Sequence, residues 1–420
     1  MMPVTGGRGE REPPAHPPVL IEGGTLVLED GTLEDGALLL AGGRIAYAGP
    51  ADLVPPYLTL PGGPTLAARQ CRRYDARGHW VFPGFFDLHV HGGGGADTMH
   101  GTAAALQRIA EVHAAHGTAH LVATTTSQEH RRVLAAVRAV RDAMALSRGE
   151  AWQGARIAGV HLEGPYVNPA RAGAQDRAHL RPPDLEELAE IAGAAGDGFL
   201  LATLAPELPG AEEAIDFLTR RGVTVAMGHT DARFEQALAA MEKGVRHVTH
   251  TFNAMSPLHH REPGAAGAAL LSGPEVTCEV IADGVHVHPR VIHALWRLKG
   301  AGGICLVTDA VAAAGMPEGE YELGGRKVTL KGGACRLADG TLAGSALTMD
   351  RAVAYVVREV GVPVHEAAAM AALTPARAVG LAGRKGSLRV GKDADVAILD
   401  HDFQCVATFV KGRAVFDKAH

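Results

Sequence analysis

His89 and His91 are two residues apart in the stretch VFPGFFDLHVHGGGG, which spans residues 81–95. The apolar and aromatic residues of 80–86 predict a buried strand, and the glycines after the histidines predict that this strand ends in a loop. Because residues two apart on a strand point to the same side, both imidazoles are expected to project together from its C-terminal end. Such a pair is suited to binding a divalent metal such as zinc.

The composition of the chain excludes several classes of function. Its 420 residues carry a formal net charge of -6, with 47% apolar and 20% charged residues. This balance offers no broad basic surface for nucleic acid or for an anionic membrane, so neither partner is expected. An anionic substrate would have to be bound by local cations. No uninterrupted apolar run reaches the roughly 18 residues of a membrane span.

The cysteines and the N-terminal residues bear on the cellular compartment. The five cysteines are odd in number and no pair has metal-ligand spacing; they are Cys71, Cys278, Cys305, Cys335 and Cys405. We therefore expect reduced thiols in a cytoplasmic protein. Residues 1–18 are rich in glycine, proline and charge and lack the apolar core of a signal peptide, which predicts a disordered tail.

Both ends of the chain show a β pattern. Residues 19–50 consist of short alternating segments separated by glycine turns, and residues 386–416 have the same texture. The simplest arrangement joins the two ends in one small β domain, made of residues 19–80 and 382–420. Residues 81–381 then form the second domain.

The middle of the chain alternates between strand-like and helix-like segments. Apolar, strand-like segments span residues 119–123, 157–162, 199–204, 223–227, 245–249, 276–281 and 304–307. Helix-like segments between them span residues 102–116, 129–147, 184–195, 212–221, 232–243 and 289–299. Repeated strand-then-helix units predict a parallel sheet, and with the strand that ends at the histidine pair their number is near eight. This number favours an α/β fold of the (β/α)8, TIM-like barrel type over an open sheet.

Polar residues gather directly after five of these strands, at 161–165, 228–231, 249–255, 282–286 and 308–310. The active sites of such barrels lie at the C-terminal ends of the strands. Each segment alone could be a turn or a helix cap, and Asp309 could merely begin a helix. Five coincidences at the same structural level instead indicate a metal-dependent hydrolase.

A set of longer motifs carries a resemblance to a known family. In chain order they are PGFFDLHVHG, HLEGPYVNPARAGAQD, GHTDA, THTFNAMSPLHHREPG, ADGVHVHP, LVTDAVAAAG and LAGSALTMDRAV. Together they resemble the N-acetylglucosamine-6-phosphate deacetylase family of the amidohydrolase superfamily, from about residue 19 to the C-terminus. The H-x-H motif is shared across the superfamily, whereas HLEGP, THTFNAM and REPG in this order are specific.

The resemblance implies which residues bind metal. Glu163 matches the carboxylate ligand of the family, and His229 and His250 match its histidine ligands. Many superfamily members, such as hydantoinases and dihydroorotases, instead carry a carboxylated lysine on the fourth strand. No lysine stands in the HLEGP segment here, which argues against these two enzymes. Some family members lack the H-x-H pair and bind one metal. Because His89 and His91 are both present, one or two divalent ions are implied, Zn²⁺ or Fe²⁺, with Glu163 bridging a second.

The resemblance also implies catalytic and substrate-binding residues. Asp309 matches the catalytic aspartate, which takes a proton from water and returns it to the departing amine. Arg261 matches the phosphate-binding arginine, and a guanidinium fork suits phosphate oxygens. Gln175 stands where the family carries His or Gln and is expected to bind the substrate or help polarise its carbonyl. The alternative for Arg261 is a solvated surface arginine, and the alternative for Gln175 is an exposed loop amide. The other implied contacts are Ala174, Asn253, Ala254, Asp283, Gly284, Val285, His286, Leu342, Ala343 and Gly344.

The expected reaction is metal-dependent deacetylation of N-acetylglucosamine 6-phosphate to glucosamine 6-phosphate and acetate, in the catabolism or recycling of amino sugars. The partner is therefore a phosphorylated amino sugar, and the family implies a homodimer. One alternative is a related substrate such as N-acetylgalactosamine 6-phosphate, because the orientation of a hexosamine 4-hydroxyl is not readable from sequence. Another is a non-catalytic binding protein on the same scaffold. Such proteins typically lose ligands or the aspartate, and all of these are retained here.

Overall fold

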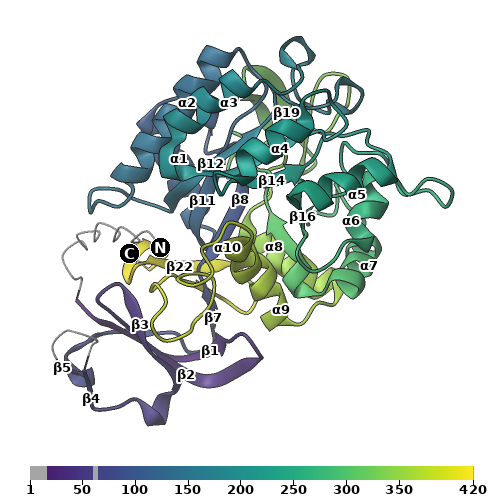
Figure 1. Cartoon of the computed structure of the whole chain (residues 1–420). Helices are drawn as coiled ribbons and strands as arrows, with labels where there is room; N and C mark the ends of the chain where they lie inside the picture. Colours follow the sequence, from purple (N-terminus) through teal and green to yellow (C-terminus); the bar gives the residue numbers. More distant parts are fainter. Residues whose placement is uncertain (1–16, 60–64, 420) are drawn as a thin grey trace, which may run out of the picture.

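The computed structural model describes residues 17–59 and 65–419 of the chain. Apart from residues 17 and 18, the disordered tail expected over residues 1–18 lies outside this described part. The chain forms a barrel of parallel strands surrounded by helices, next to a sheet that contains strands from both ends of the sequence (Figure 1). None of the described helices is both long and apolar enough to cross a membrane.

The barrel is a parallel eight-stranded sheet in the order β17-β16-β15-β14-β13-β12-β11-β8. Its strands are β8 (Phe85–Val90), β11 (Thr118–Thr124), β12 (Arg156–Glu163), β13 (Phe199–Leu204), β14 (Thr224–Met227), β15 (Val245–Val248), β16 (Thr277–Ile281) and β17 (Ile304–Val307). Their side chains are almost entirely buried, as expected for a parallel sheet that helices cover. The predicted (β/α)8 barrel is confirmed.

The first and last barrel strands, β8 and β17, meet at their C-terminal ends and close the barrel. The amide of Asp309 donates to the carbonyl of His89 over 2.9 Å, and the amide of His91 donates to the carbonyl of Ala310 over 2.9 Å. Val90 and Ala310 form a parallel bridge between these hydrogen bonds. The seam of the barrel is therefore made by residues that the sequence motifs single out.

Helices follow the strands and pack on the outside of the barrel (Figure 1). They are α1 (Ala103–Ala114), α2 (His130–Leu146), α3 (Leu185–Ala195), α4 (Ala211–Thr219), α5 (Phe234–Lys243), α6 (Gly264–Leu271) and α7 (Pro289–Lys299). Side-chain caps define several starts: Thr102 accepts from the amide of Ala105, and Asp184 accepts from the amides of Glu186 and Glu187. Helix α6 was not expected from the sequence, because GAAGAALL has no amphipathic period.

Strands from both ends of the chain pair in a second sheet, in the order β23-β22-β21-β7-β1-β2-β3, with β6 paired to β1. They are β1 (Val19–Val27), β2 (Thr32–Ala41), β3 (Arg44–Pro50), β6 (Arg72–Asp75), β7 (Trp80–Pro83), β21 (Val396–Leu399), β22 (Cys405–Val410) and β23 (Arg413–Asp417). The predicted β domain built from both termini is confirmed. We propose that it comprises residues 19–80 and 382–420, with residues 81–381 forming the barrel domain.

The predicted strand over residues 80–86 is two strands in the structure. Its first part, β7, pairs with β21 of the terminal sheet, and its second part, β8, enters the barrel. Gly84 lies between them, and its amide donates to the carbonyl of Asp395 over 2.9 Å. A Cβ atom at this glycine would lie 2.6 Å from the Cβ of Ala119, so the strands can approach only at a glycine.

A three-stranded antiparallel sheet follows β17 and was not expected from the sequence. It consists of β18 (Gly319–Leu323), β19 (Arg326–Lys331) and β20 (Ala334–Arg336), and each turn contains a glycine pair. This alternation with double-glycine turns is a readable hairpin signal. The remaining described elements are β4 (Tyr57–Thr59), β5 (Thr65–Ala67), β9 (Gly92–Gly93), β10 (Ala96–Asp97), α8 (Met349–Tyr355), α9 (Val364–Ala368) and α10 (Thr374–Ala378), with short 3-10 and π segments.

Lys385 lies where the barrel meets the terminal sheet. Its Nζ is 2.9 Å from a carboxylate oxygen of Asp393 and 3.1 Å from one of Asp395, and the same oxygen of Asp395 is 2.7 Å from Nε2 of His120 on β11. Burial opposes the charge of Asp395, but Lys385 and His120 hold the pKa of its carboxyl well below the ordinary value. This cluster ties the two sheets together.

Lys385→Met is expected to lower the free energy of unfolding by about 3 kcal/mol, because it removes the lysine partner of the buried Asp395 carboxylate. Urea unfolding followed by circular dichroism measures the change. Lys327→Met is the matched control: its exposed pair with Glu320 is expected to contribute less than about 1 kcal/mol. Equal losses in the two variants would contradict a special role for the Lys385 cluster.

Candidate metal and catalytic site

Three ligand-type side chains converge at the ends of β12, β14 and β15. Nε2 of His229 lies 3.2 Å and Nε2 of His250 lies 3.1 Å from Oε1 of Glu163, and the two nitrogens are 3.0 Å apart. All three residues are buried. In a tetrahedral zinc site with bonds of about 2.0–2.1 Å, neighbouring ligand atoms are about 3.3 Å apart. This triad therefore fits a divalent metal ion.

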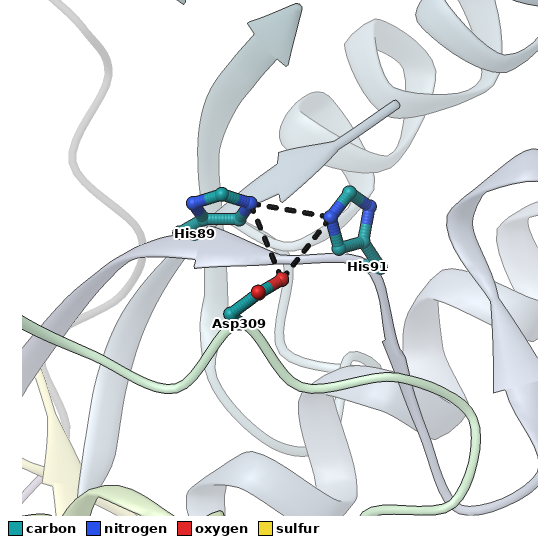
Figure 2. A group of neighbouring side chains, drawn as sticks. All are labelled: His89, His91 and Asp309. Carbon is teal, nitrogen blue, oxygen red and sulfur yellow. Dashed lines mark hydrogen bonds and ion pairs between the residues drawn. The ribbon is translucent and has the colours of Figure 1, made fainter. Parts of the chain in front are cut away.

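A second triad consists of His89, His91 and Asp309 (Figure 2). The Nε2 atoms of the two histidines are 3.2 Å apart, and they lie 3.4 and 3.3 Å from Oδ1 of Asp309. Figure 2 shows the two rings facing the carboxylate; His89 lies on β8 and His91 directly follows it, whereas Asp309 comes from the loop after β17. The spacing again matches that of ligand atoms around one small cation.

Glu163 lies between the two triads. Its Oε1 faces His229 and His250, whereas its Oε2 is 3.1 Å from Nε2 of His91. Gln175 donates from Nε2 to the same Oε2 over 2.8 Å, and its own Oε1 accepts from the amide of Ser127 over 2.7 Å. A carboxylate that bridges two ions requires two oxygens that face different ligand sets, and Glu163 has this arrangement.

Hydrogen bonds on the far side of the rings fix two of the four histidines. Nδ1 of His229 is 2.9 Å from the carbonyl oxygen of Arg171, and Nδ1 of His89 is 2.9 Å from Oε2 of Glu279. A histidine that donates from one ring nitrogen keeps the lone pair of the other for a metal. The buried Nδ1 atoms of His91 and His250 have no hydrogen-bond partner among the described residues.

Several of these residues have a left-handed backbone, with φ of 46° at His229, 28° at His250, 49° at Ala254 and 48° at Asp309. Residues other than glycine adopt this conformation at a cost, and they concentrate at functional sites. His229, His250 and Asp309 each lie two residues after the end of a barrel strand, in the turn that follows it. The strain therefore marks the same positions that converge in the triads.

The charges of the two triads depend on one another. Burial disfavours the charged form of Glu163, but neighbouring histidines, His89 foremost, hold the pKa of its carboxyl well below the ordinary value. Burial also disfavours charge on Asp309, whose pKa is nevertheless lowered by His89 and His91. Burial would lower the pKa of His91, but the two carboxylates raise it to about 9. The site thus holds ionised carboxylates that attract positive charge.

The triads open into a cavity of about 370 Å³. Its walls include twelve of the residues singled out from the sequence: His91, Glu163, Ala174, Gln175, His229, His250, Asn253, Ala254, His286, Asp309, Leu342 and Gly344. The volume lies in the range of small-molecule sites. The structure therefore brings most of the predicted site residues, which are far apart in sequence, to one cavity.

Six predicted residues do not line this cavity: His89, Arg261, Asp283, Gly284, Val285 and Ala343. His89 is fully buried beneath it. Asp283 accepts from Nδ1 of His286 over 2.7 Å and from the amides of Val285 and His286, so it holds that histidine in place. Arg261 is exposed, and its guanidinium lies 2.7 Å from Nε2 of His260.

Other wall residues were not assigned from the sequence. They are Ala170, Arg171, Gly173, Ile281, Leu323 and Thr341. Arg171 pairs through Nε with Asp231 over 2.8 Å, and its terminal nitrogens have no hydrogen-bond partner within the described chain. Leu323 ends β18 of the unexpected sheet. The signal that could have identified Arg171 is its positive charge within the NPARAG segment, just before Ala174.

The chain is similar in sequence to a known family and to proteins of known activity. The amidohydrolase family model matches residues 80–415. N-acetylglucosamine-6-phosphate deacetylase of Bacillus subtilis (strain 168) is 39% identical over 336 residues, which are 80% of this chain and 84% of that protein. N-acetylgalactosamine-6-phosphate deacetylase of Escherichia coli O157:H7 is 36% identical over 388 residues, 92% of this chain and 97% of that protein.

A solved structure has the same fold over nearly its whole length. It is a mutant of N-acetyl-D-glucosamine-6-phosphate deacetylase from Mycobacterium smegmatis in complex with N-acetyl-D-glucosamine-6-phosphate. The TM-score is 0.86 at 33% identity, and the match covers 96% of this chain and 100% of that one. With the barrel and the two ligand triads at its strand ends, these matches establish that the chain belongs to the amidohydrolase family.

Proposed function

We propose that this chain is a divalent-metal-dependent deacetylase that converts N-acetylglucosamine 6-phosphate and water to glucosamine 6-phosphate and acetate. The observation that carries the proposal is the pair of ligand triads joined by Glu163 at the base of a small-molecule cavity. Relatives named for this activity match about four-fifths of the chain, which supports the proposal.

Glu163, His229 and His250 would hold one ion, and His89 and His91 would hold a second that Glu163 bridges. A bound Zn²⁺ or Fe²⁺ would lower the pKa of water to about 7 and polarise the acetyl carbonyl. Amide hydrolysis needs this help because water is a weak nucleophile and an amine is a poor leaving group.

Asp309 would move the proton. Its carboxylate lines the cavity and is ionised, since its pKa is held below the ordinary value by His89 and His91 despite burial. It would take a proton from water as the water oxygen bonds to the acetyl carbon, and give that proton to the amine nitrogen as the C–N bond breaks. His286, anchored through Nδ1 by Asp283, would present Nε2 to the substrate.

The decisive experiment measures acetate release from N-acetylglucosamine 6-phosphate by the purified protein, beside metal analysis of the same sample. Metal-dependent release that a chelator abolishes and added Zn²⁺ or Fe²⁺ restores would support the proposal. A metal-replete protein that releases no acetate from this sugar would refute the proposal, and release from neither this sugar nor N-acetylgalactosamine 6-phosphate would favour a non-catalytic binding protein.

N-acetylgalactosamine 6-phosphate is the second candidate substrate. The Escherichia coli O157:H7 relative named for it matches 92% of this chain. The two sugars differ only in the orientation of the 4-hydroxyl, so they are to be compared side by side by kcat/KM. A higher kcat/KM for the galactosamine compound would transfer the assignment to it.

We further propose that Arg261 is the main anchor of the phosphate, with Arg171 as the cation in the cavity wall that competes for this role. Because the chain is acidic overall, a specific cation has to recognise the dianion. Arg261→Ala is expected to lower kcat/KM for the phosphorylated sugar about 10- to 150-fold, the equivalent of roughly 1.5–3 kcal/mol for a charge-assisted hydrogen bond. The activity on unphosphorylated N-acetylglucosamine, which we expect to be much weaker, should hardly change.

Arg171→Ala, assayed on the same two sugars, discriminates between the two arginines. A phosphate-specific loss in this variant alone would move the anchor from Arg261 to Arg171. Equal losses on both sugars would show that the substituted arginine supports the fold or the metal-binding loops instead.

Three further properties belong to the proposal. The protein is expected to be a homodimer, by resemblance to its family, which light scattering after size-exclusion chromatography tests. Its five cysteines are buried and unpaired, which favours a reducing compartment such as the cytoplasm. The identity and number of the ions are to be read from elemental analysis per chain.

A further inference from the structure

Glu279 is a fully buried carboxylate in the middle of β16. It lies outside the cavity wall and has no part in the proposed proton transfer. A buried carboxylate is costly unless several donors satisfy it. The groups that donate hydrogen bonds to Glu279 therefore indicate which residues it holds in place.

Two of those donors belong to the two ligand triads, one to each. Oε2 of Glu279 lies 2.9 Å from Nδ1 of His89 and also 2.9 Å from the backbone amide of His250. Oε1 lies 3.0 Å from Nε2 of His247, and the carbonyl oxygen of Glu279 accepts from the amide of Thr251 over 2.9 Å. One carboxylate oxygen thus contacts one residue from each triad.

The contact with His89 sets the tautomer of that ring. Because Nδ1 donates its proton to Glu279, the lone pair of Nε2 is directed to the other side of the ring. On that side Nε2 faces Oδ1 of Asp309 at 3.4 Å and Oε1 of Glu163 at 3.5 Å. Glu279 therefore points the metal-binding nitrogen of His89 toward the ligand atoms of both triads.

The contact with His250 stabilises a strained backbone. His250 has φ of 28°, a conformation that costs free energy outside glycine. Glu279 accepts the His250 amide with its side chain and the Thr251 amide with its main chain, so it holds the turn on both sides of the strained bond. Nε2 of His250 is thereby held 3.1 Å from Oε1 of Glu163.

We propose that Glu279 is a positioning residue that couples the two metal-binding triads by fixing the His89 ring and the His250 turn with one oxygen. This inference rests on the divalent-metal part of the proposed function and is independent of the substrate. It predicts that a change at Glu279 alters metal affinity at both triads, with the larger effect at the His89–His91 triad, where the side chain of the ligand itself is contacted.

Glu279→Gln tests the proposal because it keeps the shape and removes one acceptor oxygen and the charge. Co²⁺ is titrated into the metal-free protein, and binding is followed by visible absorption and by competition with a chelator. The dissociation constant of the more weakly bound ion is expected to rise about 10- to 100-fold, the usual effect of losing the partner of a ligating histidine. An unchanged dissociation constant would overturn the proposal.

His247→Asn is the matched control, because it perturbs the same buried cluster through the other oxygen of Glu279. Its Co²⁺ affinities should stay within a factor of about three of the parent, a shift under about 1 kcal/mol. Because both substitutions remove a partner from a buried cluster, the melting temperature of each metal-free variant is measured first, and the affinities are compared at a temperature at which both are folded. Equal losses of affinity in Glu279→Gln and His247→Asn would show that the cluster acts only through packing.

A measurement on the unmodified side chain covers the case in which Glu279→Gln does not fold. The zinc-loaded protein should show a downfield imidazole N–H proton resonance from Nδ1 of His89, assigned by its loss in His89→Gln. Absence of this resonance would overturn the proposed tautomer. Because both assays omit the substrate, normal metal binding without acetate release would refute the proposed reaction and leave the role of Glu279 standing.

Discussion

Asp309→Asn should lower turnover of N-acetylglucosamine 6-phosphate at least about 100-fold, the lower end of the contribution of a general acid–base group. Asparagine has nearly the same shape but neither accepts a proton from water nor returns one to the amine. The carboxylate lines the cavity at the seam of the barrel, where its backbone amide is held by the carbonyl of His89. That backbone contact does not depend on the side chain, so the loop should stay in place.

The measurement is kcat by acetate release, with metal per chain determined on the same preparation. Asp402→Asn serves as the control, since this exposed carboxylate pairs with Arg358 on the surface and should leave kcat unchanged. Near-normal turnover in a metal-replete Asp309→Asn protein would remove Asp309 from the reaction. Loss of metal together with activity would instead make it primarily a ligand.

The second large effect is expected at Glu163. Its Oε1 is within 3.2 Å of the ligand nitrogens of His229 and His250, and its Oε2 lies 3.1 Å from that of His91. Glu163→Gln replaces one oxygen by an amide nitrogen, which binds no cation, and removes the negative charge. Metal per chain should fall nearly to zero, and with it acetate release. Elemental analysis after dialysis against a metal-free buffer measures the first effect.

The double variant His89→Gln with His91→Asn separates the two triads. If Glu163, His229 and His250 form the primary site, this variant should keep about one ion per chain and part of the activity. If it loses all metal, the division into a primary and a secondary site is wrong. Full retention of two ions would show that this histidine pair is not a metal site.

The sequence alone determined the architecture and most of the strand-end residues. Apolar runs such as FLLATL at 199–204 alternate with amphipathic segments, and this pattern has few stable solutions other than a parallel barrel covered by helices. In a barrel the C-terminal ends of all strands meet on one face. Residues just after strands, such as His229, His250 and Asp309, were therefore expected to converge although 80 positions separate the first from the last (309 minus 229).

Contacts between distant segments were decided only by the tertiary structure. In the sequence, Glu279 is one polar residue within an apolar segment. Its hydrogen bond to His89, 190 positions away, exists because β16, β17 and β8 are consecutive around the barrel. Likewise, the fold put Arg171 in the cavity wall and Arg261 on the exposed surface. Local periodicity reports which face of an element is buried, whereas the packing of strands and loops decides which side chains meet. The barrel and its motifs could thus be predicted from the sequence, but the orientation of the ligands and their supporting bonds could not.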